Sequence, residues 1–326
     1  MIRINPCHNA YAAILHSAAW DNDAYGYVVD TLGASLAGLE LEPACVNHVL
    51  ELLAGFRRST VLTGNWVSDQ VVAFRENWMD HLEHKYLRGY DLERERYFER
   101  FIFDQILGRP LGRVLDVGCG RGKVLSTLVS SGRAEQAVGI DATDFKNAWD
   151  TEEREIPHGE PLKLEFERVA TENFTAWAKD QKRFDTVLVL YVLHHAEDYW
   201  IYRLLQGLHE LLAPRGVAYV LEDSLVEGAT PIEDIGHGEW WASHCPKGMP
   251  YPLTPGYNAQ VLLDFVAVQL LAGYADVGMP CNYRKGGDWT KIFGEAGFSV
   301  SRVLNIGFPK ARDIDVPQAL FELRCG

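Results

Sequence analysis

Glycines recur at alternate positions in "VLDVGCGRG", residues 114–122. Gly118, Gly120 and Gly122 follow a strand-like apolar run, and an amphipathic stretch begins directly after them at Lys123. A glycine-rich turn between a strand and a helix lets backbone N–H groups approach a ligand at the carboxyl edge of a sheet. The glycines alone would also suit a tight turn that binds no ligand. The residues around them are therefore needed to distinguish a ligand-binding loop from such a turn.

Charged residues near the turn narrow the choice of ligand. The dinucleotide fingerprint G-x-G-x-x-G would need a glycine where this chain has Lys123. Asp116 precedes the first glycine by two residues and suits an ammonium group better than a diphosphate. Asp141 ends the next strand-like run, "VGIDAT", where it could cap a helix or accept hydrogen bonds from ribose hydroxyls. We expect a cofactor with an ammonium end and a ribose, such as S-adenosylmethionine.

Histidines supply candidates for a general base. His194 and His195 follow the strand-like run "FDTVLVLYV", at the sheet edge where the cofactor is expected. Each could take a proton from an attacking atom, or could pack against the cofactor or the next helix. A third candidate, His237, lies in a later segment rich in glycine, proline and tryptophan.

That later segment also holds potential metal ligands. Carboxylates and imidazoles suit iron, manganese or zinc, although the segment has no tight motif such as H-E-x-x-H. One interpretation of the segment is therefore a site for a divalent metal. The other is a lid that covers the substrate, in which these residues have no role as ligands. The residues concerned are Asp223, Glu233, Asp234, His237, Glu239 and His244.

The wider sequence predicts the elements that position these residues. Residues 1–108 show apolar positions at helical spacing and are expected to form a helical region that covers the substrate or mediates a homodimer. Residues 109–326 alternate strand-like and amphipathic runs, which is typical of a mostly parallel α/β sheet. The last two strand-like runs have no helix between them, so an antiparallel edge hairpin is expected. A helical or loop lid is expected as an insertion at about residues 225–286.

The order of four stretches resembles one known family. "VLDVGCGRG", "VGIDAT", "FDTVLVLYVLHH" and "LLAPRGVAYVLEDS", within about residues 110–225, are similar to class I S-adenosylmethionine-dependent methyltransferases. The resemblance implies a Rossmann-like sheet of seven strands, with the glycines along the methionine moiety and Asp141 at the ribose. It also implies that the turn at residues 169–172 faces the adenine, although "VATENF" departs from the usual acidic and small pair. The implied cofactor set is Asp116, Gly118, Gly120, Gly122, Asp141, Ala142, Thr171 and Tyr191.

Composition limits the partners. The chain has 326 residues, is 47% hydrophobic and carries a net charge of −14, with no dense basic block to neutralise phosphates. Nucleic acid is therefore disfavoured, and the stretch "LYVLHH" lacks the N-P-P-Y type motif of DNA amino-methylating enzymes. The six cysteines form no C-x-x-C pair, and no sustained apolar run is long enough to cross a membrane. We expect a cytoplasmic protein without disulfides.

These expectations combine into a methyltransferase that modifies an oxygen, nitrogen or carbon atom of a small molecule, in a setting such as natural-product biosynthesis. Two alternatives stay open at this point. One is metal-assisted C-methylation of an enolisable or carrier-bound acyl substrate. The other is a non-catalytic partner protein that binds S-adenosylmethionine.

Overall fold

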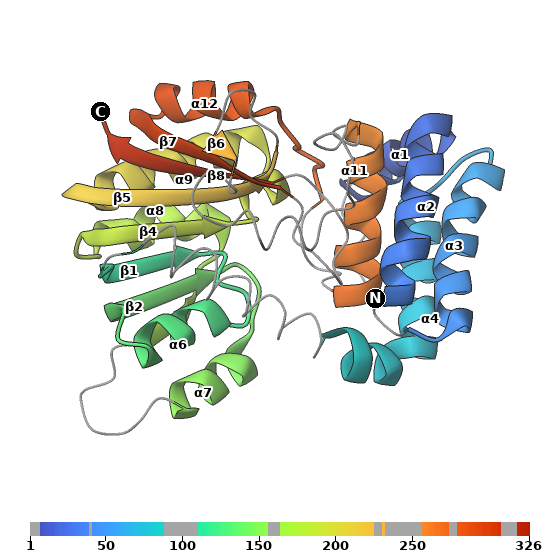
Figure 1. Ribbon diagram of the computed structural model, residues 1–326, viewed down its shortest axis with the longest axis horizontal. Coiled ribbons are helices and arrows are strands. Elements are labelled where there is room, and N and C mark those ends of the chain that lie inside the picture. Colours follow the sequence, from blue (N-terminus) through green and yellow to red (C-terminus); the bar gives the residue numbers. More distant parts are fainter. Residues whose placement is uncertain are drawn as a thin grey trace. The chain divides into compact units, whose positions relative to one another are not determined.

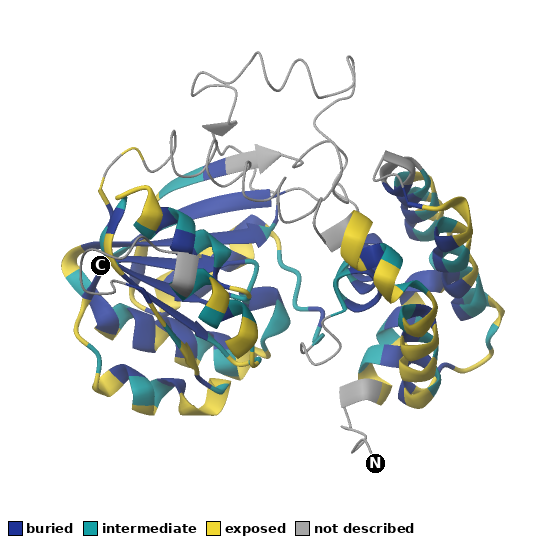
Figure 2. Ribbon diagram, turned by 90° about the horizontal axis from the view of Figure 1, so that it is seen from below, coloured by how far each residue is buried: buried dark blue, intermediate teal, exposed yellow. Residues whose placement is uncertain are grey.

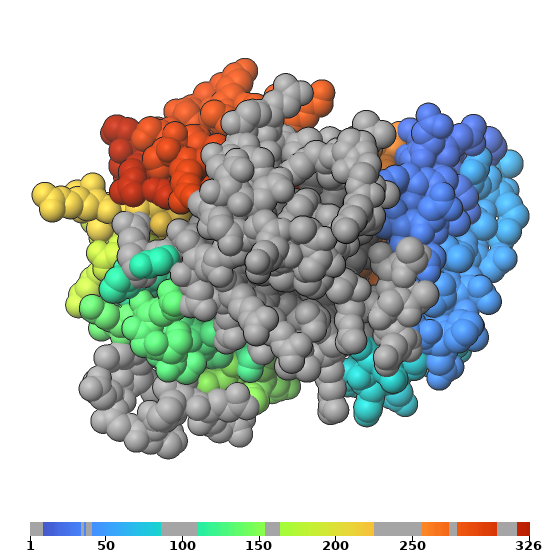
Figure 3. Space-filling model, in the orientation of Figure 1, coloured from blue at the N-terminus to red at the C-terminus, as the bar shows by residue number. Residues whose placement is uncertain are grey.

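The computed structural model divides into two compact units, and each is described by itself. The helical unit comprises Met1–Arg94, Ile235–Tyr283 and Gly307–Pro317, and the sheet unit comprises Glu95–Asp234, Arg284–Ile306 and Gln318–Gly326. Within them the structure describes residues 7–38, 41–87, 108, 110–155, 164–224, 230–231, 256–273, 279–307 and 318–326, which are coloured in Figure 3.

The helical unit confirms the helical N-terminal region that the apolar spacing predicts (Figure 1). Its elements are α1 (Cys7–Trp20), α2 (Asn22–Gly38), α3 (Pro43–Arg58), α4 (Gly64–Leu82), the π-helix η1 (Glu83–Leu87), α11 (Tyr257–Asp264) and the π-helix η6 (Phe265–Ala272). Local signals start two of them, because Pro43 stands in the first turn of α3 and the Thr63 hydroxyl accepts a hydrogen bond from Trp66 N (3.3 Å) ahead of α4.

The core of the helical unit combines residues from both ends of the sequence. Phe56 of α3 and Phe265 of η6 are fully buried and pack edge to face, with ring centroids 5.1 Å apart. Figure 2 shows buried positions on the helices of this unit beside exposed ones. The segment expected to be a lid thus contributes α11 and η6 to the same core as α1–α4. A lid function, and a domain boundary at residue 108, stay predictions.

The sheet unit has the predicted mostly parallel sheet (Figure 1). The strand order is β3-β2-β1-β4-β5-β8-β7-β6. The bounds are β1 (Gly112–Val117), β2 (Ala134–Asp141), β3 (Leu164–Arg168), β4 (Phe184–Leu190), β5 (Leu212–Asp223), β6 (Thr230–Pro231), β7 (Phe298–Gly307) and β8 (Gln318–Cys325). The seven longer strands confirm the expected seven-stranded architecture, and β6 adds two residues that pair in parallel with β7.

The edge formed by the C-terminal strands is antiparallel, as predicted. Strand β8 pairs antiparallel with β5, with Val220 opposite Phe321. On its other side, the Ser301 hydroxyl of β7 donates to Glu322 O (3.1 Å) and the Ser299 hydroxyl donates to Arg324 O (3.3 Å). The residue numbers of the bonded positions rise along β7 while they fall along β8. The two strands therefore also run in opposite directions.

Helices cover the sheet on both faces. Helices α8 (Phe174–Lys179), α9 (Asp198–Leu211) and α12 (Gly286–Glu295) share one apolar core with one face of the sheet. Helices α6 (Lys123–Ser130) and α7 (Lys146–Glu155) lie over the opposite face near β2 and β3. Two short 3-10 helices, η3 (Thr171–Asn173) and η4 (Leu193–His195), follow strands β3 and β4.

This topology determines where a ligand would bind. The connections from β1 lead outward to β2 and β3, whereas β4 and β5 lie on the other side of β1. Ligands of open α/β sheets bind outside the carboxyl ends of the strands at such a reversal of direction. Among the described helices, none combines the length and the apolar character needed to cross a membrane.

Candidate functional site

The glycine turn joins β1 to α6 at the reversal point, and each glycine has its own structural reason. All three adopt positive φ values, 71° at Gly118, 53° at Gly120 and 86° at Gly122. A Cβ on Gly118 would overlap the Val192 side chain, and a Cβ on Gly122 would lie 2.6 Å from Cε1 of Phe166. A Cβ on Gly120 would meet no described atom within 4 Å. Gly120 is therefore the position at which a ligand could approach the backbone closely.

Asp141 holds the turn in place from the end of β2. Its Oδ2 accepts a hydrogen bond from Gly120 N (2.9 Å), and its Oδ1 accepts one from Thr143 N (2.8 Å). Burial raises the pKa of Asp141, and the hydrogen bonds from the Thr143 and Gly120 amides oppose this shift. The Thr143 side chain and the Ala142 amide also interact with this carboxylate, so ribose hydroxyls would share its oxygens with the turn. The ribose role stays a prediction that this geometry permits.

Trp149 of α7 fixes the other side of Gly120 and was not found by sequence reasoning. Its indole Nε1 donates to Gly120 O (2.8 Å). Its ring stacks on Phe166 of β3 at 5.6 Å between centroids and 9° between planes, and Phe166 in turn fills the space next to Gly122. The N–H and the carbonyl of Gly120 are thus both held by side chains. The sequence does contain one indication of this role, because Trp149 is the single tryptophan in the otherwise polar helix α7.

Two other residues of the strand and turn are buried. Asp116 is 3% exposed and lies in register with Gly139 of β2 and Leu188 of β4. Burial, and the nearby Asp116 and Asp141, raise the pKa of the Cys119 thiol. Cys119 therefore stays protonated at neutral pH and is unsuited to act as a nucleophile.

The predicted adenine side lies at the ends of β2 and β3. Val169 N donates to Asp141 O (2.9 Å), so the turn after β3 lies beside the end of β2. Ala142 O accepts a hydrogen bond from Arg168 Nε (3.1 Å), and Thr171 is exposed at the start of η3. The fold brings the predicted residues Asp141, Ala142 and Thr171 to one edge of the sheet, while their contact with adenine stays a prediction.

Tyr191 has an unusual backbone directly after β4. Its φ of 59° is left-handed, which is uncommon for a residue other than glycine and is often found at functional sites. Its hydroxyl donates to Gln318 Oε1 (2.6 Å), and Gln318 Nε2 lies 3.4 Å from Asp223 Oδ1. This network ties together the ends of β4, β5 and β8. The sequence named Tyr191 and Asp223 but contained no signal for Gln318.

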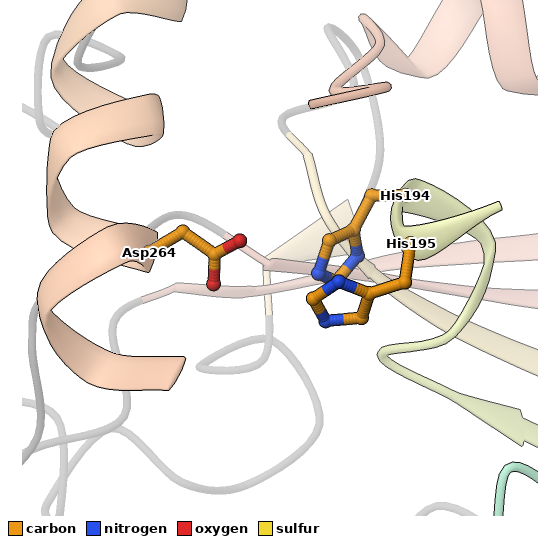
Figure 4. Close-up of side chains that lie close together, drawn as sticks. All are labelled: His194, His195 and Asp264. Atoms are coloured by element: carbon orange, nitrogen blue, oxygen red, sulfur yellow. The ribbon is translucent and has the colours of Figure 1, made fainter. Parts of the chain in front are cut away.

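A buried histidine and carboxylate lie at the carboxyl end of β4. His194 Nδ1 lies 2.6 Å from Oε2 of Glu222, and the two residues are 3% and 1% exposed. Oε1 of Glu222 accepts hydrogen bonds from Val192 N (3.1 Å) and Leu193 N (2.7 Å). The ring of His195 lies against that of His194, with centroids 4.0 Å apart (Figure 4).

This pairing defines the hydrogen-bonding state of the imidazole. A carboxylate anion only accepts hydrogen bonds, so with Glu222 in that form Nδ1 would carry the proton of this bond. Nε2 is then the ring nitrogen that can accept a proton. Sequence reasoning named the histidine and missed Glu222, because an acidic residue inside a strand gives no local sign of its partner.

The remaining candidates cannot be compared with the predicted site. His237, Glu233, Asp234, Glu239 and His244 lie outside the described residues. Asp223 ends β5 within the hydrogen-bonded network described above. The proposed metal ligands of this segment therefore stay predictions.

Comparisons with known proteins add a family match. A family model described as "Methyltransferase domain" matches residues 84–303, which is more than half of the 326-residue chain. No curated protein gives a significant match.

Solved structures match at low identity. A riboflavin-derivative dimethyltransferase, N,N-8-amino-8-demethyl-D-riboflavin dimethyltransferase from Streptomyces davawensis, is 18% identical, with 78% of this chain and 64% of that chain covered at a TM-score of 0.43. A structure described for disulfide-to-thioacetal conversion in echinomycin biosynthesis is 20% identical, with coverages of 69% and 81% and a TM-score of 0.41. Mitomycin 7-O-methyltransferase is 15% identical, with coverages of 66% and 49% and a TM-score of 0.40, so the match spans about half of that protein.

Proposed function

Because this chain belongs to the methyltransferase-domain family and is a class I S-adenosylmethionine-dependent methyltransferase, we propose that it methylates a small molecule with His194 as the general base. The acceptor atom is an oxygen, nitrogen or carbon that loses a proton during the reaction. The observation that carries the assignment of the base is the buried pair of His194 and Glu222 at the carboxyl end of β4. The net charge of −14 supports a small acceptor over a polyanion.

The residues of the sheet unit fit the cofactor. The space beside Gly120 admits a ligand close to the backbone, and the Asp141 carboxylate is oriented by two amides next to it. Asp116 places a further acidic side chain at the end of β1. When bound, the cofactor supplies a methyl group on a positively charged sulfur. The protein then has to position the acceptor, exclude water and take up a proton.

His194 performs the proton transfer in this proposal. Nε2 takes the proton that the acceptor atom loses, and the imidazole becomes an imidazolium. Glu222 is a positioning residue, because it holds the proton on Nδ1 and stabilises the positive charge that forms on the ring. The hydrogen bonds from the Val192 and Leu193 amides hold Glu222 itself. The general base contributes about 10²–10⁴ in rate when proton transfer is needed.

The test is formation of S-adenosylhomocysteine by the full chain with a panel of phenols, amines and enolisable carbonyl compounds. His194→Ala should lower kcat by about 10²–10⁴ on the best acceptor, with unchanged affinity for S-adenosylhomocysteine. Glu222→Gln should lower kcat by about tenfold or more and move the acid limb of the pH–rate profile to lower pH, because a neutral amide stabilises the imidazolium less.

Two control variants separate the base from its surroundings. His84→Ala changes an exposed histidine of the helical unit and should leave kcat unchanged. His195→Ala tests the neighbouring ring and should affect kcat less than His194→Ala does. Equal activity of His194→Ala and wild type would refute the base. Cofactor binding without turnover on any acceptor would favour the non-catalytic alternative, and activity abolished by chelation would favour the metal-assisted alternative.

A further inference from the structure

The helical unit contains a polar cluster that the proposed methyl transfer does not use. Tyr11 lies on α1, Asp264 is the last residue of α11, and Tyr283 packs against the core of the unit two positions after Cys281. Helices α1 and α11 are in contact, which brings Tyr11 near Asp264 although 253 positions separate them in the sequence (264 − 11). Tyr11 and Tyr283 are partly buried and pack against the apolar core of the unit, and the Tyr11 hydroxyl oxygen itself is buried.

Tyr11 has a buried hydroxyl group with no hydrogen-bond partner among the described residues. A buried, unsatisfied hydroxyl costs about 1–3 kcal/mol, and most buried polar groups in proteins avoid this cost. Burial, together with the nearby Cys281 and Asp264, raises the pKa of Tyr11 well above its usual value. The phenol therefore stays protonated and continues to offer a hydrogen-bond donor at every physiological pH.

Asp264 offers the opposite kind of group. Its Oδ2 accepts a hydrogen bond from the Tyr283 hydroxyl, and Oδ1 is not part of that bond. Burial and the nearby Asp264 raise the pKa of Tyr283, so this donor also stays protonated. The cluster therefore presents a phenol donor at Tyr11 and a carboxylate acceptor at Asp264.

Backbone irregularities occur on both sides of the cluster. Asp264 stands at the junction where α11 ends and the π-helix η6 begins. π-Helical segments are rare in proteins as a whole, but those that occur are often found at functional sites. Cys281 adopts a left-handed φ of 55° and is 3% exposed, although it is not glycine. Such conformations persist where the surrounding structure imposes them, often at ligand sites.

We propose that Tyr11, Asp264 and Tyr283 form a binding site for a neutral small molecule that carries a hydroxyl group. The ligand hydroxyl accepts a hydrogen bond from Tyr11 and donates one to Asp264. A carbonyl or ether oxygen would satisfy Tyr11 alone, and an ammonium group would satisfy Asp264 without accepting from Tyr11. A hydroxyl group satisfies both. Tyr257, 47% exposed, contacts the Tyr283 ring with centroids 6.0 Å apart and provides an aromatic wall for such a ligand.

The experiment uses three fluorinated probes with the full chain, followed by ¹⁹F NMR titration. 4-Fluorophenol can donate and accept, 4-fluoroanisole can only accept, and fluorobenzene can do neither through oxygen. We expect 4-fluorophenol to bind about tenfold more tightly than the other two. Tyr11→Phe and Asp264→Asn should each weaken 4-fluorophenol binding by about tenfold.

A matched control is Tyr25→Phe. Tyr25 of α2 packs against the same core, and its ring lies 4.5 Å from the Arg57 guanidinium carbon. This variant should bind 4-fluorophenol as wild type does. In the absence of ligand, Tyr11→Phe should keep or raise the Tm, because it removes an unsatisfied hydroxyl.

Three results would overturn the proposal. Equal binding of all three probes would show that the hydroxyl is not recognised. Wild-type affinity in Tyr11→Phe would place the probe elsewhere in the protein. A lower Tm in Tyr11→Phe with unchanged probe binding would show that the Tyr11 hydroxyl has a structural role only.

Discussion

Substituting the glycines of the turn one at a time separates folding from ligand binding. Gly120 and Gly122 both have positive φ, but only Gly122 faces a neighbouring side chain, the ring of Phe166. Gly132 follows α6, has a φ of 70° and faces open space, as Gly120 does. Gly132→Ala therefore measures the backbone cost alone, away from the predicted cofactor site.

The expected magnitudes follow from these surroundings. An alanine in the left-handed region costs about 1–2 kcal/mol, which applies to all three positions. At Gly122 the new Cβ would also lie 2.6 Å from Cε1 of Phe166, a ring that cannot easily move because it stacks on Trp149. Overpacking of this kind adds about 1–3 kcal/mol. At about 2–4 °C per kcal/mol, Gly120→Ala and Gly132→Ala should lower Tm by about 2–8 °C, and Gly122→Ala by roughly twice as much.

The affinity for S-adenosylhomocysteine should rank the variants differently from the Tm. We expect Gly120→Ala to weaken S-adenosylhomocysteine binding by about tenfold or more, measured by isothermal titration calorimetry, because its Cβ occupies the approach to the backbone. Gly132→Ala should bind as wild type does. The reasoning is refuted if Gly120→Ala and Gly132→Ala bind equally well, or if Gly122→Ala is as stable as Gly132→Ala. Should Gly122→Ala fold poorly, its cost can be measured in a Phe166→Ala background, where it should fall to that of Gly132→Ala.

Two further predictions concern other parts of the structure. Trp149→Phe removes the hydrogen bond to Gly120 O and should weaken S-adenosylhomocysteine binding by a few-fold, since such a bond contributes about 0.5–1.5 kcal/mol. The control in the same calorimetric measurement is Trp177→Phe, which loses a hydrogen bond to the exposed Glu167 and should leave the affinity unchanged. Burial raises the pKa of Cys281 to about 12, so the stability gained from its protonated thiol is complete below about pH 9 and is lost as pH rises toward 12. Cys281→Ala should accordingly flatten the decline of Tm between pH 9 and 10.5, and an equally steep decline would contradict the assignment.

Much of the architecture follows from local patterns in the sequence. Alternation of strand-like and amphipathic runs predicts the parallel sheet, because a helix is the usual connection between neighbouring parallel strands. The last two strand-like runs of the sequence follow each other without an amphipathic run between them, which similarly predicts the antiparallel edge. The glycine spacing at 118–122 predicts the turn, since positive φ values are much more easily adopted by glycine than by residues with a side chain.

The different requirements of the three glycines depend on tertiary contacts. The sequence makes Gly118, Gly120 and Gly122 equivalent, whereas packing against Val192 and Phe166 makes only Gly120 open to a ligand. Trp149 belongs to the site because α7 folds back over the turn. Neither relation is visible locally, because the partners come from different elements whose packing sets their distance.

The pairing of His194 with Glu222 shows most clearly what sequence and structure each contribute. The sequence alone identified a histidine after a strand at the carboxyl edge of the sheet, because strand endings and residue types are local properties. It could not identify Glu222, which stands inside the apolar strand β5, 28 positions away. The parallel pairing of β4 with β5 brings the two side chains together, and burial then makes the hydrogen bond between them strong enough to fix the imidazole.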